Sequence, residues 1–158
     1  MDESITKNAN KKHNKNFLAT QIQQVVKSAY VQNFTNKGFE MDGRIFHLKE
    51  QLLKNPQHNW TIEEMSQTVE LSIPHFQKLF KAETGIAPVT FLRDLRLEKA
   101  RKFLETKFYR LKQIGFEVGM PNNSHFTRDF KRKYGVTPTE YRKQYWEKVQ
   151  IEKLAGKK

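Results

Sequence analysis

The chain has 158 residues, with 29 Lys or Arg against 17 Asp or Glu, so its formal net charge is +12. It contains no Cys, which excludes disulfides, thiolate nucleophiles and Cys-ligated zinc. It also has no apolar run typical of a membrane span or a secretory signal. Nineteen of the basic and eleven of the acidic residues lie between positions 44 and 143. We therefore expect a soluble intracellular protein with an anionic partner, and nucleic acid is the first candidate.

The first 40 residues differ from the rest of the chain. Residues 1–16 are polar and Lys-rich and predict a disordered basic tail. Residues 17–40 contain apolar positions at helical spacing up to Phe34, followed by Asn36, Lys37 and Gly38, and are interpreted as an N-terminal helix or a linker remnant. That helix is the last element of a lost domain, a dimerisation helix, or a helix docked on the next part of the chain.

Three helices are predicted between Asp42 and Gly85 from cap residues and apolar spacing. Thr61 is followed three residues later by Glu64, which is the pattern of a capping box. The predicted helices run from Asp42 to Asn55-Pro56, from Thr61 to Val69, and from Ser72 to Gly85.

Four more helices follow, and no stretch alternates apolar and polar residues as a strand would. Asn122 and Asn123 are both candidate caps for the third of them. The predicted helices run from Pro88 to about Thr106, from Arg110 to Val118, from Asn122 or Asn123 to Gly135, and from Pro138 through Tyr145. The chain is predicted to be all-α.

The strongest feature of the sequence is an internal repeat. A shift of 50 residues aligns His75 with His125, Phe76 with Phe126, Phe80 with Phe130, Lys81 with Lys131, Gly85 with Gly135, and Pro88 with Pro138. A shift of 49 aligns Ile62 with Leu111, Met65 with Ile114, and Val69 with Val118. Each copy consists of a helix, a short turn and a second helix, so the chain is predicted to hold two helix-turn-helix units.

The second helix of each copy has one apolar and one polar face. The paired phenylalanines are predicted to be core residues. The opposite face offers Gln77, Lys78 and Lys81 in the first copy, and Asn123, Ser124, Thr127, Arg128, Lys131 and Arg132 in the second. Amide and cationic side chains read base edges in the major groove, and cations one turn further along suit phosphates. A polar helix face is otherwise an ordinary solvated surface.

The helix over 88–106 is long enough to separate two DNA readers. Its roughly 18 residues span about 27 Å, and successive major grooves on one side of B-DNA lie about 34 Å apart. Phe91, Leu92 and Leu95 are predicted to face one way, and Leu97, Ala100, Phe103 and Leu104 roughly the other. We interpret the helix as a rigid connector, with one helix-turn-helix unit packed on each of its halves. The alternative is an ordinary core helix with a wide apolar face.

These motifs together resemble the C-terminal DNA-binding domain of the AraC/XylS family of bacterial transcription regulators, over about residues 44–146. The matching motifs are Leu71-Ser72, His75-Phe76, Leu79-Phe80-Lys81, Gly85, Pro88, Phe91-Leu92-Arg93, Arg96-Leu97, Ala100, Ile114-Gly115, Val118-Gly119, Ser124-His125-Phe126, Arg128, Phe130-Lys131, Gly135-Val136-Thr137-Pro138 and Tyr141-Arg142. The resemblance implies two helix-turn-helix subdomains, each a three-helix, homeodomain-like unit, joined by a long linker helix. We assign 41–87 and 108–148 to the subdomains, 88–107 to the linker helix and 149–158 to a basic tail.

The resemblance also implies a site. Base contacts would come from Ile73, Pro74, Gln77, Lys78, Asn123, Ser124, Thr127 and Arg128. Phosphate contacts would come from Thr61, whose cap exposes backbone N–H groups, and from Lys81, Lys131 and Arg132. The expected partners are promoter DNA of about 20 base pairs and RNA polymerase, in a cytoplasmic, nucleoid-associated activator without metal or cofactor. A partner for effector binding or dimerisation is expected on the N-terminal side.

Three positions depart from the family pattern. Arg110 replaces a small capping residue, Gly115 replaces the usual alanine, and Met120 replaces an aromatic residue in the turn. Glycine in a helix costs about 1 kcal/mol, so the second copy is expected to be looser. Pro74 offers only an apolar contact, suited to a thymine methyl group.

Other functions have weaker support. The five histidines do not fall at metal-binding spacing, and His75 and His125 are expected to make structural hydrogen bonds. Asp94 and Glu98 are expected to form surface ion pairs on the linker helix. We therefore expect no enzyme activity. The competing class is a basic architectural nucleic-acid-binding protein without strong sequence preference, which would carry Lys and Arg on its reading face in place of amides and hydroxyls.

Overall fold

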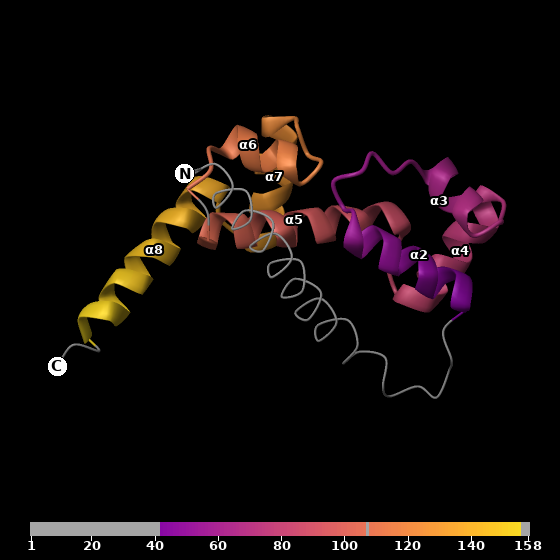
Figure 1. Ribbon diagram of the computed structural model, residues 1–158, viewed down its shortest axis with the longest axis horizontal. Coiled ribbons are helices and arrows are strands. Elements are labelled where there is room, and N and C mark those ends of the chain that lie inside the picture. Colours follow the sequence, from indigo (N-terminus) through magenta and orange to yellow (C-terminus); the bar gives the residue numbers. More distant parts are fainter. Residues whose placement is uncertain (1–41, 107, 156–158) are drawn as a thin grey trace, which may run out of the picture. The chain divides into compact units, whose positions relative to one another are not determined.

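The structure is a computed structural model that describes residues 42–106 and 108–155, and within these ranges all regular structure is helical (Figure 1). The helices are α2 (Gly43–Lys54), α3 (Ile62–Thr68), α4 (Ile73–Thr84), α5 (Pro88–Thr106), α6 (Leu111–Glu117), α7 (Asn123–Tyr134) and α8 (Pro138–Ala155). The predicted all-α fold class is confirmed. The tail expected over 1–16 and the helix or linker expected over 17–40 lie outside the described residues.

The described residues divide into two units, with the boundary between Lys54 and Asn55. In the first unit, Asp42 caps α2 as predicted, because its carboxylate accepts a hydrogen bond from the Arg44 backbone N–H at 2.9 Å. Hydrogen bonds from Arg44 lower the pKa of the Asp42 carboxyl to about 2. The predicted apolar face of α2 is buried and consists of Ile45, Leu48 and Leu52.

The second unit contains the two copies of the repeat, with α3 packed on α4 and α6 packed on α7. The turns close in the same way. The Leu71 N–H donates to the Ser66 carbonyl at 3.0 Å, and the Met120 N–H donates to the Gly115 carbonyl at 2.7 Å. The donors and the acceptors are each 49 residues apart, so the predicted repeat is also a repeat of backbone structure.

Each copy is built on its pair of phenylalanines. The rings of Phe76 and Phe80 meet edge to face with centroids 5.6 Å apart, and those of Phe126 and Phe130 do the same at 5.9 Å. All four side chains are fully buried, as predicted. Edge-to-face contacts add to the burial of aromatic surface, so these pairs fix which face of α4 and of α7 points inward.

Helices α3 and α6 each make one of the two hydrogen bonds of a capping box, and each makes a different one. Thr61 Oγ1 accepts from the Glu64 N–H at 3.1 Å, but the Glu64 carboxylate lies 2.8 Å from His58 Nε2, so the predicted reciprocal bond is replaced. At α6, the Gln113 side chain accepts from the Arg110 N–H at 2.9 Å. A guanidinium group has no acceptor, so Arg110 cannot supply the other half of the box.

Helices α4 and α7 also differ in the residue that caps their N-terminus. Ser72 has extended backbone and precedes α4, but its side chain makes no capping hydrogen bond. Asn122 is the cap of α7, with its side chain accepting from the His125 N–H at 3.0 Å. This settles the choice between Asn122 and Asn123.

Glycine in the second turn has a packing reason. A Cβ on Gly115 would lie 2.7 Å from the Met120 carbonyl oxygen, so this glycine permits the close approach that the turn hydrogen bond requires. Gly119 has φ +76, and its counterpart in the first copy, Glu70, has φ 54. Only glycine adopts this left-handed conformation without cost. The prediction of a looser second copy considered only the low helix propensity of glycine. It did not include the close contact with Met120 that favours glycine at 115.

The linker helix α5 has 19 residues and a length of about 28 Å. All seven of its predicted apolar positions are buried. Near its start, Phe91 packs on Phe80 of α4 with centroids 5.4 Å apart. Near its end, Phe103 packs on Tyr109, just before α6, at 5.9 Å. One helix therefore receives packing from both copies of the repeat.

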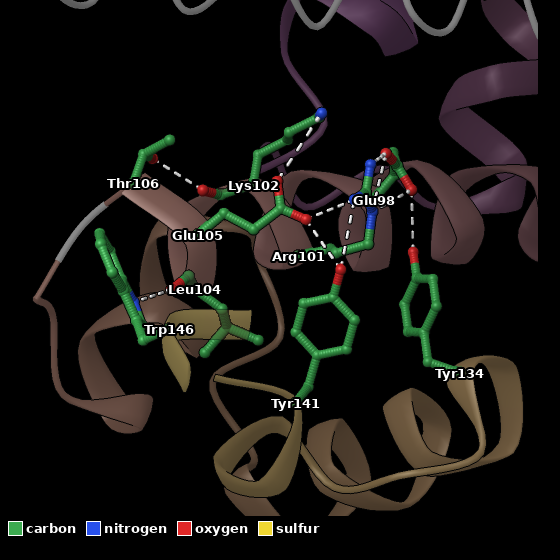
Figure 2. Close-up of polar contacts among 9 residues, drawn as sticks. All are labelled: Glu98, Arg101, Lys102, Leu104, Glu105, Thr106, Tyr134, Tyr141 and Trp146. Atoms are coloured by element: carbon green, nitrogen blue, oxygen red, sulfur yellow. Dashed lines mark hydrogen bonds and ion pairs between the residues drawn. The ribbon is translucent and has the colours of Figure 1, made fainter. Parts of the chain in front are cut away.

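Figure 2 shows a charged network where α5 meets the second copy. Arg101 Nε donates to both oxygens of Glu98 at 3.1 and 3.2 Å and also pairs with Glu105. The Tyr134 hydroxyl donates to Glu98 at 2.9 Å, and the Tyr141 hydroxyl donates to Glu105 at 2.8 Å. The prediction of an ordinary surface pair at Glu98 is wrong, because its side chain is only 21% exposed. Asp94 does form an ion pair, with Lys133 at 3.5 Å.

Helix α8 packs along α5. The Trp146 indole donates to the Leu104 carbonyl at 3.3 Å and stacks on Phe108 with centroids 5.3 Å apart. The helix continues to Ala155, beyond the predicted subdomain boundary at 148 and into the segment assigned to a basic tail.

The charged network makes stability depend on pH. Burial raises the pKa of the Glu98 carboxyl, but hydrogen bonding to Arg101 and its charge outweigh burial, so the pKa falls below its ordinary value. The folded state therefore gains stability above about pH 4.3, the ordinary pKa of Glu, and loses it as the pH falls through the lower folded pKa. We expect Glu98→Gln to cost about 1–3 kcal/mol at pH 7 and progressively less below pH 4, measured by urea unfolding.

The exposed pair of Lys143 with Glu147 provides the control. Glu147→Gln should change the unfolding free energy by less than about 0.5 kcal/mol. An equal cost of Glu98→Gln at pH 7 and pH 3.5 would contradict the pH argument.

The two left-handed turn positions should respond to substitution with opposite sign. Gly119→Ala should destabilise by at least about 1–2 kcal/mol, because a side chain is disfavoured at this φ and its Cβ would lie 2.9 Å from the Gln57 carbonyl oxygen. Glu70→Gly should be neutral or stabilise by up to about 1 kcal/mol, since it relieves the same strain. Thermal unfolding of both variants measures the difference. A shift of the unfolding temperature in the same direction for both would contradict the left-handed strain assigned to these two positions.

Candidate nucleic-acid interface

The base-reading residues predicted in the first copy lie on the first two turns of α4. Pro74, Gln77 and Lys78 are exposed, and Ile73 is half-buried. They lie away from the buried Phe76, so the core contact orients the polar face outward. Pro74 is at the second helical position, where its missing N–H costs nothing because no carbonyl precedes it in the helix.

The second copy presents the equivalent positions on α7. Asn123, Ser124 and Arg128 are exposed, and Thr127 is half-buried. The two faces therefore match position by position across the repeat, as the 50-residue shift predicts. Their chemistry differs, because the second face is richer in hydroxyl and amide groups.

The predicted phosphate-binding residues are all exposed: Thr61, Lys81, Lys131 and Arg132. Lys131 and Arg132 occupy the last turn of α7, where cations are stabilised by the helix dipole. Thr61 is less favourable, because Glu63 and Glu64 follow it in the first turn of α3 and place negative charge beside the predicted phosphate.

Asp129 is a buried acidic residue of α7, beside the second face, that the sequence reasoning missed. Its carboxylate is 12% exposed and accepts from the Arg132 guanidinium at 2.8 Å, while Arg128 Nε lies 3.6 Å away. Two of the predicted DNA-contacting cations therefore already share a carboxylate. The first copy has Leu79 at the equivalent position. This difference between the two copies is the sequence feature that could have identified Asp129.

His75 and His125 also border the two faces. Both are exposed, and the hydrogen bond at position 125 is made by the backbone N–H, to Asn122. The expected structural hydrogen bonds of the rings are not found among the residues that the structure describes. Because both residues are exposed at equivalent positions of the repeat, both rings lie at the edge of the candidate interface.

Within residues 42–106 and 108–155, no helix is long and apolar enough to cross a membrane. No three His, Asp or Glu side chains in the same ranges lie close enough together to hold a metal ion.

Comparison with known proteins places this geometry in a family. A family model described as a helix-turn-helix domain matches residues 65–144. The HTH-type transcriptional regulator MtrA of Neisseria gonorrhoeae is 31% identical over 108 residues, which are 68% of this chain and 36% of MtrA. The chain spans about two fifths of the length of such curated relatives, 36% in one case and 41% in another.

Solved structures share the fold. The DNA-binding domain of the global transcriptional factor AdpA, solved in complex with a target DNA, matches 68% of this chain and 96% of that domain, with a TM-score of 0.66 and 22% identity. A probable AraC family transcriptional regulator from Rhodopseudomonas palustris CGA009 matches 66% of this chain and 98% of its own, with a TM-score of 0.60 and 23% identity. This chain, with its two helix-turn-helix units on one linker helix, belongs to the AraC-type helix-turn-helix family.

Proposed function

We propose that the chain is a sequence-specific transcription regulator that reads two adjacent major-groove segments of double-stranded DNA with α4 and α7. The observation that carries this proposal is the paired geometry: two copies of one fold present exposed polar faces at equivalent positions, each opposite two buried phenylalanines. A major groove accommodates one α-helix, and a linker of about 28 Å suits two helices in successive grooves.

The composition of the faces favours sequence reading over general DNA binding. Gln77, Asn123, Ser124 and Thr127 are donors and acceptors without net charge, so they gain little from phosphates and more from base edges. The competing function, a basic architectural protein without strong sequence preference, would rely on Lys and Arg at these positions. The net charge of +12 supplies attraction to DNA in either case.

The family supports the biological side of the proposal. MtrA is named a transcriptional regulator, and the AdpA domain was solved with target DNA. We propose by analogy that this chain binds a promoter of about 20 base pairs, contacts RNA polymerase as an activator, and works in the bacterial cytoplasm in association with the nucleoid. The role is binding and not catalysis, and an effector or dimerisation partner would act through the segment before α2.

Selection of bound sites from a random DNA pool tests this function directly. We expect one asymmetric motif with two conserved blocks about 10 base pairs apart. In gel shifts over a salt series, the selected site should bind about a thousandfold more tightly than random duplex. Enrichment of no motif, with equal binding to every duplex, would favour the architectural alternative.

Substitutions should separate base readers from phosphate contacts. Gln77→Ala and Arg128→Ala should each cost about 1–3 kcal/mol on the selected site and relax the preference at one block. Lys131→Ala should weaken all duplexes alike and lower the salt slope by about one. Unchanged preferred sequences for both Gln77→Ala and Arg128→Ala would mean that the readers are wrongly assigned.

Asp129 should limit binding to random DNA by holding Arg132. Asp129→Asn keeps the side-chain volume and removes the charge, so Arg132 becomes available to phosphate. We expect binding to random duplex to tighten about threefold at moderate salt, with the salt slope steeper by up to one. In an Arg132→Ala background the same substitution should have little effect. An equal gain in both backgrounds would show that Asp129 acts by direct repulsion of DNA.

A further inference from the structure

An arginine of the linker helix makes two hydrogen bonds to the backbone of the loop between α2 and α3. Arg96 of α5 donates from Nε to the Pro56 carbonyl and from NH2 to the His58 carbonyl, both at 2.8 Å. Lys99, one turn further along α5, donates to the Gln57 side chain at 2.7 Å. The planar guanidinium holds two carbonyls in fixed directions at once, so the path of the loop that leads into α3 is set by α5.

The same loop touches the turn of the second copy. A Cβ on Gly119 would lie 2.9 Å from the Gln57 carbonyl oxygen and 3.2 Å from Arg96 Nε. Three segments therefore meet at this glycine: the loop that precedes the first helix-turn-helix, the linker helix, and the turn between α6 and α7. Only a residue without a side chain fits between them, and Arg96 of the linker helix binds the loop and lies beside the turn.

Each of these contacts joins segments far apart in the chain. Arg96 lies 40 residues from Pro56 and 38 residues from His58. Pro56 is buried, so its carbonyl has limited access to water and the arginine satisfies a group that burial would otherwise leave unpaired. The α3–α4 copy is thus attached to the second copy at this junction as well as through the continuous helix α5.

We propose that Arg96 is a positioning residue that sets the separation and relative rotation of the two reading helices, and with them the spacing of the two DNA blocks that the chain accepts. This rests on the proposed function. One added base pair moves a block by about 3.4 Å and rotates it by about 34°. A protein whose two copies are held at the junction follows such a change poorly, whereas a protein held only through α5 follows it by bending.

The test uses the full chain and three duplexes: the selected site, the same site with one base pair inserted between its blocks, and a duplex with only one block intact. For the unmodified chain we expect the insertion to weaken binding about tenfold or more. For Arg96→Met we expect about tenfold weaker binding to the selected site, a penalty of about threefold or less for the insertion, and one-block affinity within about twofold of the original.

Two further variants keep the test decisive. Arg96→Lys retains the positive charge but cannot hold two carbonyls as a planar guanidinium does. The loss of affinity caused by the inserted base pair, the spacing penalty, should therefore lie between those of the unmodified chain and of Arg96→Met. If Arg96→Met does not fold, Arg96→Lys replaces it in the test. Lys99→Met is the matched control, because it removes a neighbouring cation of α5 that donates to the Gln57 side chain. Its spacing penalty should stay at about tenfold.

The outcomes distinguish the inference from the proposed function. If the unmodified chain binds the inserted and original sites equally, or binds no duplex selectively, the two-groove function itself fails. If the unmodified chain shows the penalty and folded Arg96→Lys and Arg96→Met keep it in full, the function stands and the positioning role of Arg96 is overturned. Equal losses on all three duplexes would likewise overturn it, because they indicate a merely structural role.

Discussion

Burial of two phenylalanines on one side of a 12-residue helix is the constraint on which each half of the molecule depends. Phe76 with Phe80, and Phe126 with Phe130, are fully buried, and burial of one such ring stabilises a fold by about 2–3 kcal/mol. Exposed substitutions on the opposite face usually change stability by less than about 0.5 kcal/mol. The outer faces of α4 and α7 can therefore carry whatever chemistry DNA recognition requires without endangering the fold.

The linker helix holds the two units together. It packs on Phe80 through Phe91, and it holds the second copy through the network of Glu98, Arg101 and Glu105, into which Tyr134 and Tyr141 point their hydroxyls (Figure 2). Burial, reinforced by the negative charge of Glu98, raises the pKa of Tyr134, so this hydroxyl remains a hydrogen-bond donor across the physiological range. A helix fixed by apolar contacts at one end and by charge-assisted hydrogen bonds at the other resists reorientation of either unit.

Local signals made most of the fold predictable. Glycine stops, proline starts and paired phenylalanines recur at one offset, so the helices from α3 to α7 and the burial of the paired phenylalanines follow from the sequence. The errors concern side chains whose partners lie elsewhere. Glu64 binds His58 in place of its own helix cap, and Glu98 accepts from Tyr134, 36 residues away, as well as from Arg101. Arg96 was visible only as part of a motif, because its partners lie about forty residues earlier. Asp129 was overlooked because the comparison of the two copies considered identical residues, whereas position 129 differs from its counterpart, Leu79.

The most direct test of two-groove reading is a methylation-protection footprint of the full chain on its selected site, which reports access to guanine N7 in the major groove. Two protected patches on one face of the duplex, about 10 base pairs apart, are the predicted result. A single patch, or protection of the sugar-phosphate backbone with every guanine N7 still reactive, would contradict the account.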